Sequence, residues 1–551
     1  MADKLFVIAI GGTGMRCLES FVHLSAIGMF DNQEIDILTL DTDQANGNLK
    51  RVWDLIDLYN AIKTPAGAAP IDFGGKPSNN TFFSAKLNLT KYWPSYSGDV
   101  TYQKLSQIAT RDEASQENID LASLFLEEPA QTFNLAHGYR AQTHLGSQLM
   151  YHAILDAAIK VKKNNAAPQE KALMEYIDKI VKAKSNSRVF IFGSIFGGTG
   201  ASSIPVIPVA FKDAIAITNA LPIEAKFGAS LLTEYFSFTS PNEAQKKKPG
   251  NGVIADASYF TLNSQAALQF YENDPTVENT YKYLYNVGWP VNTKSDFSKG
   301  KSENETITGG EKQLNPCHVT ELMCAFAAYD FFTREDFPEK KVEYLFRTAK
   351  YENDTFQFEF KDFTENEKSF KNRLTGFYAI SLFTLVNLEG IDKDKEGLSG
   401  WLNRMKAMRY MEFENTFSDL DKKQINAYFK AFLFNKDSDL INDGWLYQIR
   451  NSFTGKFLLP NSSFDKDYIA IKKINPGILL NDEISQWGMG KSLIGKPSPK
   501  DVGQTFNDFI DEFIKEENIK IEDSQNIEGA KMKLMAQLFK TISRKQQVEL
   551  F

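Results

Sequence analysis

Residues 190–208, FIFGSIFGGTGASSIPVIP, form the stretch that decides the fold. An apolar run ends at Gly193, a glycine-rich loop follows at 197–200 (the second glycine loop), and a helix-like segment continues to about Asp213. This order of strand, glycine loop and helix presents backbone N–H groups to a phosphate in α/β proteins. Glycine suits such a loop because it allows a positive φ and places no Cβ between the backbone and the anion. The candidate phosphate-binding residues here are Gly197, Gly198, Thr199 and Gly200.

A similar loop lies near the start of the sequence. The apolar residues 5–10 lead directly into Gly11, Gly12, Thr13 and Gly14 (the first glycine loop), and an amphipathic stretch follows at 17–30. Either loop alone could be an ordinary tight turn between a strand and a helix. Two such units in one chain favour a nucleotide whose phosphates are held from two sides.

An acidic cluster follows the next predicted strand. Residues 35–40 form that strand, and Asp41 and Asp43 come directly after it. Strand, helix and strand in succession predict a βαβ unit, and therefore a parallel sheet with right-handed crossovers. The aspartates could accept a ribose hydroxyl, as in a dinucleotide-binding fold, or belong to a nucleotide or Mg²⁺ environment in another α/β fold.

A third candidate loop precedes a predicted helix at 147–162. Residues 134–146, NLAHGYRAQTHLG, include Gly138 and Arg140. Arginine would offer a forked cation to a terminal phosphate. A solvated surface arginine explains the same residue equally well.

Composition and charge narrow the class of protein. The 551 residues are enough for two or more domains, and 42% hydrophobic with 24% charged residues is typical of a globular chain. The formal net charge of −8 argues against non-specific binding to nucleic acid. Cys317, His318 and Cys324 lack a fourth ligand at zinc-type spacing, so packing thiols are expected and no metal site. Without a disulfide framework, a signal peptide or an apolar run of transmembrane length, we expect a cytoplasmic protein with no integral membrane segment.

The predicted organisation has three parts. Residues 1–314 are expected to form a nucleotide-binding α/β domain, with an insertion at about 60–130. Residues 315–340 are predicted to be a buried central helix, with Asn315 as N-cap and Pro316 in the first turn. Residues 341–551 are expected to be mixed and mostly helical, beginning with a hairpin at 342–363. The last helix, 527–548, would pack on the body or dock a protein partner.

Four segments, in order along the chain, resemble the tubulin/FtsZ superfamily and in particular its divergent bacterial members. Residues 8–14 look like the first FtsZ phosphate loop, and residues 40–44, LDTDQ, are similar to its NTDAQ-type segment. Residues 138–146 resemble the loop that senses the γ-phosphate, and 196–205, FGGTGASSIP, look like the GGGTGSG signature. The signature departs from the family at Phe196, where its first glycine belongs, and at Ser202, where its last belongs. Phe196 is expected to restrict the approach of the backbone to a phosphate.

The resemblance implies GTP or GDP, with Mg²⁺, across the carboxyl ends of the sheet. The second glycine loop would wrap the phosphates, the first would approach them, and Asp41 or Asp43 would lie near the metal or ribose. The family reads the base partly from the start of its central helix, where Asn315 or Glu321 would hydrogen-bond guanine and His318 would stack on it. A histidine satisfied near a helix start is the alternative for His318.

Hydrolysis in this family uses an acidic loop that reaches the nucleotide of the next subunit in a filament. The nearest match is Asp362-Phe-Thr-Glu365, where both acids would position the attacking water. An acid pair that caps a helix explains these residues equally well. The hairpin predicted before Asp362 also departs from the family's short connection.

The resemblance therefore implies a GTP-binding protein that assembles with copies of itself and hydrolyses GTP on assembly. The alternative is a GTP-binding switch or scaffold that does not polymerise, in a bacterial stress or defence complex. A remote alternative is an NAD-dependent oxidoreductase. That reading lacks the third glycine of the dinucleotide fingerprint, because Cys17 stands there, and it leaves the second glycine loop unexplained.

Overall fold

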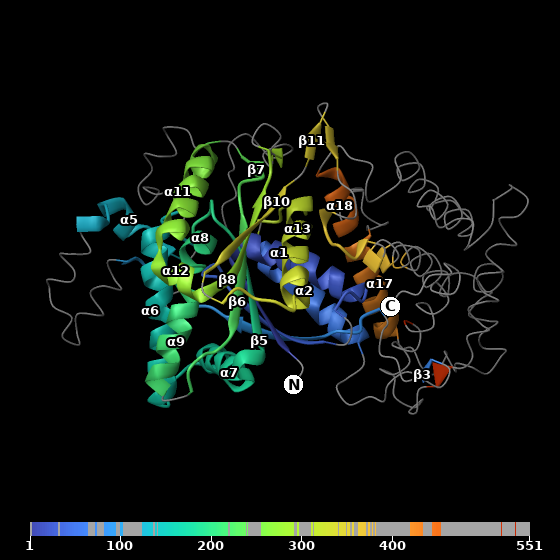
Figure 1. Cartoon of the computed structure of the whole chain (residues 1–551), viewed down its shortest axis with the longest axis horizontal. Helices are drawn as coiled ribbons and strands as arrows, with labels where there is room; N and C mark the ends of the chain where they lie inside the picture. The colour runs from blue at the N-terminus through green and yellow to red at the C-terminus, as the bar shows by residue number, and fades with distance from the viewer. Residues whose placement is uncertain are drawn as a thin grey trace, which may run out of the picture.

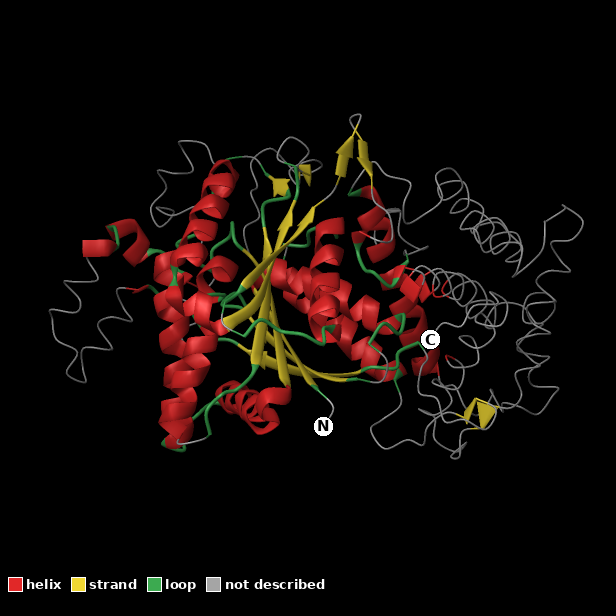
Figure 2. Ribbon diagram, in the orientation of Figure 1, coloured by secondary structure: helices red, strands yellow, loops and turns green. Residues whose placement is uncertain are grey.

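The computed structural model describes most of residues 3–357, with its main gaps within 64–81, 95–123, 239–254 and 291–309. Farther along the chain it describes parts of 362–381, and then 419–433, 444–452, 519–520 and 535. Helices cover both sides of a twisted central sheet in this part of the molecule (Figures 1 and 2). The predicted α/β class is therefore confirmed.

The central sheet has seven strands, all parallel, in the order β10-β8-β6-β5-β1-β2-β4. Most of these strands are apolar on both faces; β1 and β5, for example, are buried almost throughout. A parallel sheet needs such strands, because helices cover both of its faces. The strands are β1 (Lys4–Ile10), β2 (Glu34–Leu40), β4 (Lys86–Tyr92), β5 (Ser187–Ser194), β6 (Lys226–Leu232), β8 (Tyr281–Gly288) and β10 (Glu343–Thr348).

Two hydrophobic cores lie on the two faces of the sheet. One core packs against α1 (Gly11–Ala26), α2 (Gly47–Ile62) and α13 (Val319–Thr333). The other packs against α6 (Thr143–Lys162), α7 (Pro168–Ala183), α9 (Ile207–Thr218) and the end of α11 (Phe260–Asn273). The shorter described elements are β3 (Asp72–Phe73), α5 (Glu128–Thr132), α8 (Thr199–Ser203), β7 (Phe236–Ser237), α12 (Pro275–Thr280), β9 (Ser295–Asp296) and β13 (Ile519–Lys520).

The order of the strands creates a switch point between β1 and β5. From β1 the chain moves outward to β2 and β4, and it then returns to β5 on the other side of β1 before continuing outward to β6, β8 and β10. In open α/β sheets, ligands bind outside the carboxyl ends of the strands at such a point. The two strands that flank it end at Ile10 and Ser194, and a glycine loop follows each.

The strand pairing differs from the predicted organisation in two places. The first half of the segment predicted as a hairpin is β10, which pairs with β8 in the main sheet; only β11 (Lys350–Glu352) and β12 (Thr355–Gln357) form a hairpin. Alternating apolar residues do not distinguish these two arrangements. Likewise, β4 is a strand of the main sheet although it lies inside the predicted insertion.

The central helix is confirmed, but its N-cap is not Asn315. α13 starts at Val319, and the Nδ1 atom of His318 accepts a hydrogen bond from the N–H of Thr320. The helix body is almost entirely buried, as its apolar sequence predicted. Within the described residues, no helix is both long enough and apolar enough to cross a bilayer.

Parts of the predicted C-terminal region pack into the hydrophobic core that lies against α1, α2 and α13. In α17 (Asp419–Phe432), Tyr428 places its hydroxyl 3.1 Å from His23 Nδ1 of α1. In α18 (Trp445–Asn451), the indole N–H of Trp445 donates to Ser20 Oγ at 2.9 Å. The predicted helix 527–548 lies outside the described residues except for Met535, which is helical and fully buried in the same core.

Candidate functional site

The first glycine loop forms the start of α1. Gly11 has a φ of +64°, a conformation that glycine adopts without strain. Ile10 occupies the N-cap position, and no side chain caps the helix there. The first N–H groups of a helix have no partner within the helix, and Gly12 and Thr13 are only half-buried. The loop can therefore present backbone donors and the positive end of a long helix to an anion.

The second glycine loop lies beside the first. A Cβ added to Gly11 would come within 3.2 Å of Thr199 Cβ and 3.8 Å of the backbone nitrogen of Gly200. Gly197, Gly198 and Thr199 are half-buried, and α8 also begins without a side-chain cap. The two loops that flank the switch point thus face each other across a short gap.

Two of the predicted glycines have a different role. A Cβ on Gly14 would lie 2.6 Å from the carbonyl oxygen of Phe192, and one on Gly200 would lie 2.6 Å from that of Ser194. Such contacts do not occur in folded proteins, so these glycines let the starts of α1 and α8 pack tightly on β5. They support the loops.

Phe196, which was expected to restrict the approach to a phosphate, turns its side chain into the core. Its ring is 2% exposed and lies 4.9 Å from the ring of Phe260 and 5.5 Å from that of Phe236. Ser202, the other departure from the signature, donates its hydroxyl to the carbonyl of Thr199. Neither residue therefore places its side chain over the glycines.

The third predicted loop, at residues 134–146, also comes close to Thr199. Gly138 has a φ of +79°, and a Cβ there would lie 3.3 Å from Thr199 Oγ1 and 3.8 Å from Thr42 Oγ1. Four residues from four loops therefore lie close together: Gly11, Thr42, Gly138 and Thr199. This group is called the loop cluster here. Arg140, predicted to face a terminal phosphate, lies outside the described residues.

Asp41 and Thr42, at the loop cluster, each carry a buried polar atom without a hydrogen-bond partner among the described residues. The Oδ1 atom of Asp41 accepts the N–H of Asp43 at 3.2 Å, whereas its Oδ2 is buried and has no hydrogen-bond partner among the described residues. The same holds for Thr42 Oγ1. Burial, with Asp43 nearby, raises the pKa of Asp41 to about 7. A buried polar atom without a partner is costly unless a ligand or water satisfies it.

Both carboxylate oxygens of Asp43 accept backbone hydrogen bonds. Its Oδ1 accepts the N–H of Ala45, and its Oδ2 accepts the N–H of Gly310 at 2.7 Å. The N–H of Gly47 in turn donates to the carbonyl of Gly310. Asp43 thus fixes the loop after β2 to the segment that leads into α13, which leaves Asp41 as the acid available to a ligand.

Two asparagines complete this side of the site. Asn46 caps α2 and donates its amide to Gln313 Oε1 at 2.8 Å. The Oδ1 atom of Asn48 accepts the N–H of Asn315, but its Nδ2 is buried and unpaired in the described structure. These amide nitrogens lie 3.1 Å (Asn46) and 3.5 Å (Asn48) from a Cβ built on Gly12. Sequence reasoning missed both residues and Thr42, although all three belong to the polar segment between Asp41 and the first turn of α2.

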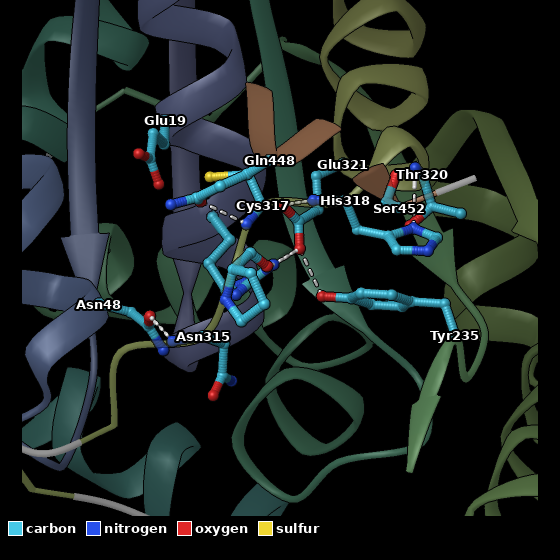
Figure 3. A network of polar contacts seen from close by, with 12 residues as sticks. Glu19, Asn48, Tyr235, Asn315, Cys317, His318, Thr320, Glu321, Gln448 and Ser452 are labelled. Atoms are coloured by element: carbon cyan, nitrogen blue, oxygen red, sulfur yellow. Dashed lines mark hydrogen bonds and ion pairs between the residues drawn. The ribbon is translucent and has the colours of Figure 1, made fainter. Parts of the chain in front are cut away.

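Glu321, predicted to read the base, lies in a buried ion pair (Figure 3). Its Oε1 accepts hydrogen bonds from Arg16 Nε at 2.6 Å and from the Tyr235 hydroxyl at 2.5 Å, and its Oε2 accepts the N–H of His318. Arg16 also donates to the carbonyl of Pro316. Glu321 and Arg16 are 0% and 1% exposed. Both oxygens of Glu321 are therefore used inside the protein.

His318 belongs to the same group. Its ring centroid lies 4.7 Å from those of both Tyr235 and Trp289, and it is 1% exposed. Burial, with Arg16 nearby, holds its pKa well below the usual range, so the ring is neutral. Four residues thus fix the start of α13 against α1: Arg16, Tyr235, His318 and Glu321. They are called the α13 network here.

Of the three predicted base-reading residues, Asn315 has the freest side chain. Its backbone N–H donates to Asn48, and its carbonyl accepts from Arg51 at 3.0 Å. Figure 3 shows its side-chain amide pointing away from the α13 network. It is 9% exposed.

The predicted catalytic acids lie beside α13, away from the loop cluster. The ring of Phe363, between the two acids, packs 5.6 Å from that of Phe326, halfway along the helix. Asp362 is half-buried and Glu365 is exposed. The Oγ1 atom of Thr364 accepts the N–H of Asn366 at 3.2 Å in the turn between these acids and the next helical residues.

Taken together, the loop cluster fits an anionic ligand with a polar extension. Two uncapped helix starts supply backbone donors, Thr42 and Asn48 supply unpaired donors, and Asp41 supplies a carboxylate oxygen suited to a hard cation. Comparisons of this chain with protein-family models, with curated proteins and with solved structures gave no match.

Proposed function

We propose that the chain binds a nucleotide through its phosphates at the switch point between β1 and β5. The carrying observation is that the first and second glycine loops face each other there, with Gly11, Gly138, Thr42 and Thr199 in one group. A phosphate chain would satisfy donors that are unpaired among the described residues and would receive the positive ends of α1 and α8.

The residues divide into two kinds under this proposal. Gly11, Gly12, Thr13, Gly197, Gly198 and Thr199 hold the phosphates, whereas Gly14 and Gly200 allow the close packing that brings the loops together. Asp41 holds the Mg²⁺ that accompanies a nucleoside triphosphate, and this ion would keep its carboxylate charged at neutral pH. The divalent ion would offset the charge of the phosphates.

We further propose that the base is guanine and that the fold is of the tubulin/FtsZ type. This step is supported by the four motifs in family order and by a sheet and central helix that accommodate them. Asn315 is the proposed contact to the base. Glu321 and His318 are assigned to the α13 network, because their polar atoms and rings already serve α1 and α13.

Two forms of GTP-dependent behaviour are compatible with this proposal. In the first, copies assemble end to end and Asp362 or Glu365 positions water on the neighbour's nucleotide. In the second, the protein is a GTP-binding switch or scaffold that neither assembles nor hydrolyses efficiently. The partial burial of Asp362, next to the packed ring of Phe363, favours the second form, whereas the exposure of Glu365 is compatible with the first.

Binding of GTP, ATP and NAD to the full chain, each with Mg²⁺, tests the proposal. We expect GTP to bind most tightly by titration calorimetry; NAD binding without GTP binding would overturn the assignment. Light scattering and phosphate release with added GTP then separate the two forms. Concentration-dependent scattering with hydrolysis identifies the assembling GTPase, and binding without either identifies the switch.

A further inference from the structure

Among the described strands, β10 lies at the edge of the central sheet. It pairs with β8 along its whole length, and no described strand pairs with its other edge (Figure 1). The open N–H and C=O groups of such an edge can accept a further strand. The sequence of β10, EYLFRT, has neither proline nor lysine to discourage such pairing.

An apolar surface accompanies this edge. Phe346 is 73% exposed although it lies within a strand. Tyr344, on the same face of the sheet, donates its hydroxyl to the carbonyl of Tyr271 at the end of α11, and the neighbouring Phe270 is 51% exposed. Exposed aromatic side chains therefore occur on β10 and on the end of α11 that Tyr344 contacts. Exposed apolar surface of this kind marks interaction sites.

On the opposite face, β10 carries two charged side chains, Glu343 and Arg347, that form weak or no ion pairs with the described residues. Glu343 is exposed and forms no ion pair with the described residues. Arg347 reaches Asp330 only at 3.8 Å, and Asp330 already pairs with Arg334 at 2.9 Å. The Nε atom of Arg347 has no hydrogen-bond partner in the described structure.

We propose that β10 pairs with β10 of a second copy, antiparallel, about a two-fold axis at Leu345. Facing residues in an antiparallel pair lie on the same side of the sheet. In this register Glu343 of each copy faces Arg347 of the other, twice per dimer. Tyr344 of each copy faces Phe346 of the other, which covers the exposed ring. The two sheets then form one continuous sheet of fourteen strands, twice the seven in one copy.

The neighbouring registers lack this complementarity. With the axis at Tyr344, Glu343 would face Leu345; with the axis at Phe346, Arg347 would face Leu345. Both place a charge against an apolar side chain, which disfavours pairing. A second copy is thus the occupant that the charges of this edge select, because the strand is complementary to itself. The proposal is independent of nucleotide binding.

The oligomeric state of the nucleotide-free full chain tests the proposal. Sedimentation equilibrium should give the mass of a dimer. Phe346→Lys and Glu343→Arg should each weaken dimerisation at least tenfold, and the exchange Glu343→Arg with Arg347→Glu should restore it. Phe125→Lys is the matched control, because Phe125 is also 73% exposed but lies far from β10 in sequence and outside the sheet; it should leave the dimer intact.

Cross-linking tests the register directly. Leu345→Cys should form a disulfide between copies under mild oxidation, since the two Leu345 residues face each other at the axis. The native cysteines are buried and should not compete. A monomer at all concentrations, a dimer unaffected by Phe346→Lys and Glu343→Arg in folded protein, or association only with nucleotide and lost in Thr199→Arg would overturn the proposal.

Discussion

The loop cluster and the α13 network differ in how their buried carboxylates are satisfied, although α1 contributes to both. Only one residue separates Gly14 of the first loop from Arg16 of the network. In the network, both oxygens of Glu321 are hydrogen-bonded. Beside the loop cluster, Asp41 Oδ2, Thr42 Oγ1 and Asn48 Nδ2 have no partners in the described structure. A carboxylate with both oxygens hydrogen-bonded inside the protein indicates a structural role, although the Nε2 atom of His318 in the network also lacks a partner in the described structure. An unpaired carboxylate oxygen beside glycine loops indicates a place for a ligand.

The largest effect is expected when the α13 network is broken. Glu321→Ala leaves Arg16 charged and buried without its carboxylate, which should lower the free energy of unfolding by about 3–5 kcal/mol. Urea unfolding measures the loss. The double variant Arg16→Met with Glu321→Leu should recover most of it, because it removes both charges. A Glu321→Ala protein of normal stability that fails to bind GTP would reverse the roles assigned to the two clusters.

A second effect concerns pH. Because burial raises the pKa of Asp41 to about 7, the folded protein holds a proton that the unfolded chain releases near pH 4. Between these values the folded state binds more protons, so this residue makes stability fall as pH rises, by about 4 kcal/mol in all. Above pH 7 the contribution is constant.

Asp41→Asn should remove this dependence in the nucleotide-free protein. Unfolding free energies from pH 4 to 8 should fall less steeply for the variant than for the wild type, and the variant should be more stable at pH 8. It should also lose the Mg²⁺ dependence of GTP binding. If the unfolding free energies of the two proteins fell equally with rising pH, the raised pKa of Asp41 would not be the cause of the pH dependence.

A smaller effect is expected from filling the gap between the glycine loops. Gly11→Ala forces an L-residue into a positive φ, at a cost of about 1–2 kcal/mol, and places a Cβ 3.2 Å from that of Thr199. The strain is present with or without GTP and therefore lowers stability. The added methyl group occupies the gap between the loops, so GTP affinity should fall about tenfold or more, or by at least 1.4 kcal/mol. Gly28→Ala is the control: its φ is +84°, but it lies beyond the other end of α1. Equal losses of affinity in both variants would mean that strain alone, rather than the occupied gap, is responsible.

The smallest effect on binding is expected at the acidic segment. Asp362→Ala should leave GTP affinity unchanged, because Asp362 lies beside α13 rather than in the loop cluster. If the protein assembles and hydrolyses GTP, the steady-state phosphate release of this variant should be slower than that of Glu367→Ala, a nearby exposed acid. Equal rates would place the water-positioning group elsewhere.

The glycine loops, the parallel sheet and the buried central helix could be predicted because each depends on local sequence. A glycine loop directly after an apolar strand marks its own position, and the apolar surface of α13 marks burial. The role of each glycine could not be predicted. Gly14 and Gly200 resemble their neighbours in sequence, and only their contacts with β5 assign them to packing.

Long-range pairing explains where the structure differs from the sequence-based expectations. Glu321 looks like a free acid at a helix start, but its partner Arg16 lies 305 residues away in the sequence. The alternation in β10 is the same whether the strand pairs with its neighbour in a hairpin or with β8. Thr42, Asn46 and Asn48 were overlooked because their relevance comes from their contact with loops far along the chain.

The affinity of Thr199→Arg for GTP tests the central claim most directly, because Thr199 contacts both the first glycine loop and the Gly138 loop. The arginine side chain would fill the loop cluster. Titration calorimetry should detect no GTP binding, with the melting temperature close to that of the wild type. Thr132→Arg, which adds the same charge at an exposed site on α5, should bind normally. Unchanged GTP affinity in Thr199→Arg would contradict the assignment of the phosphate site.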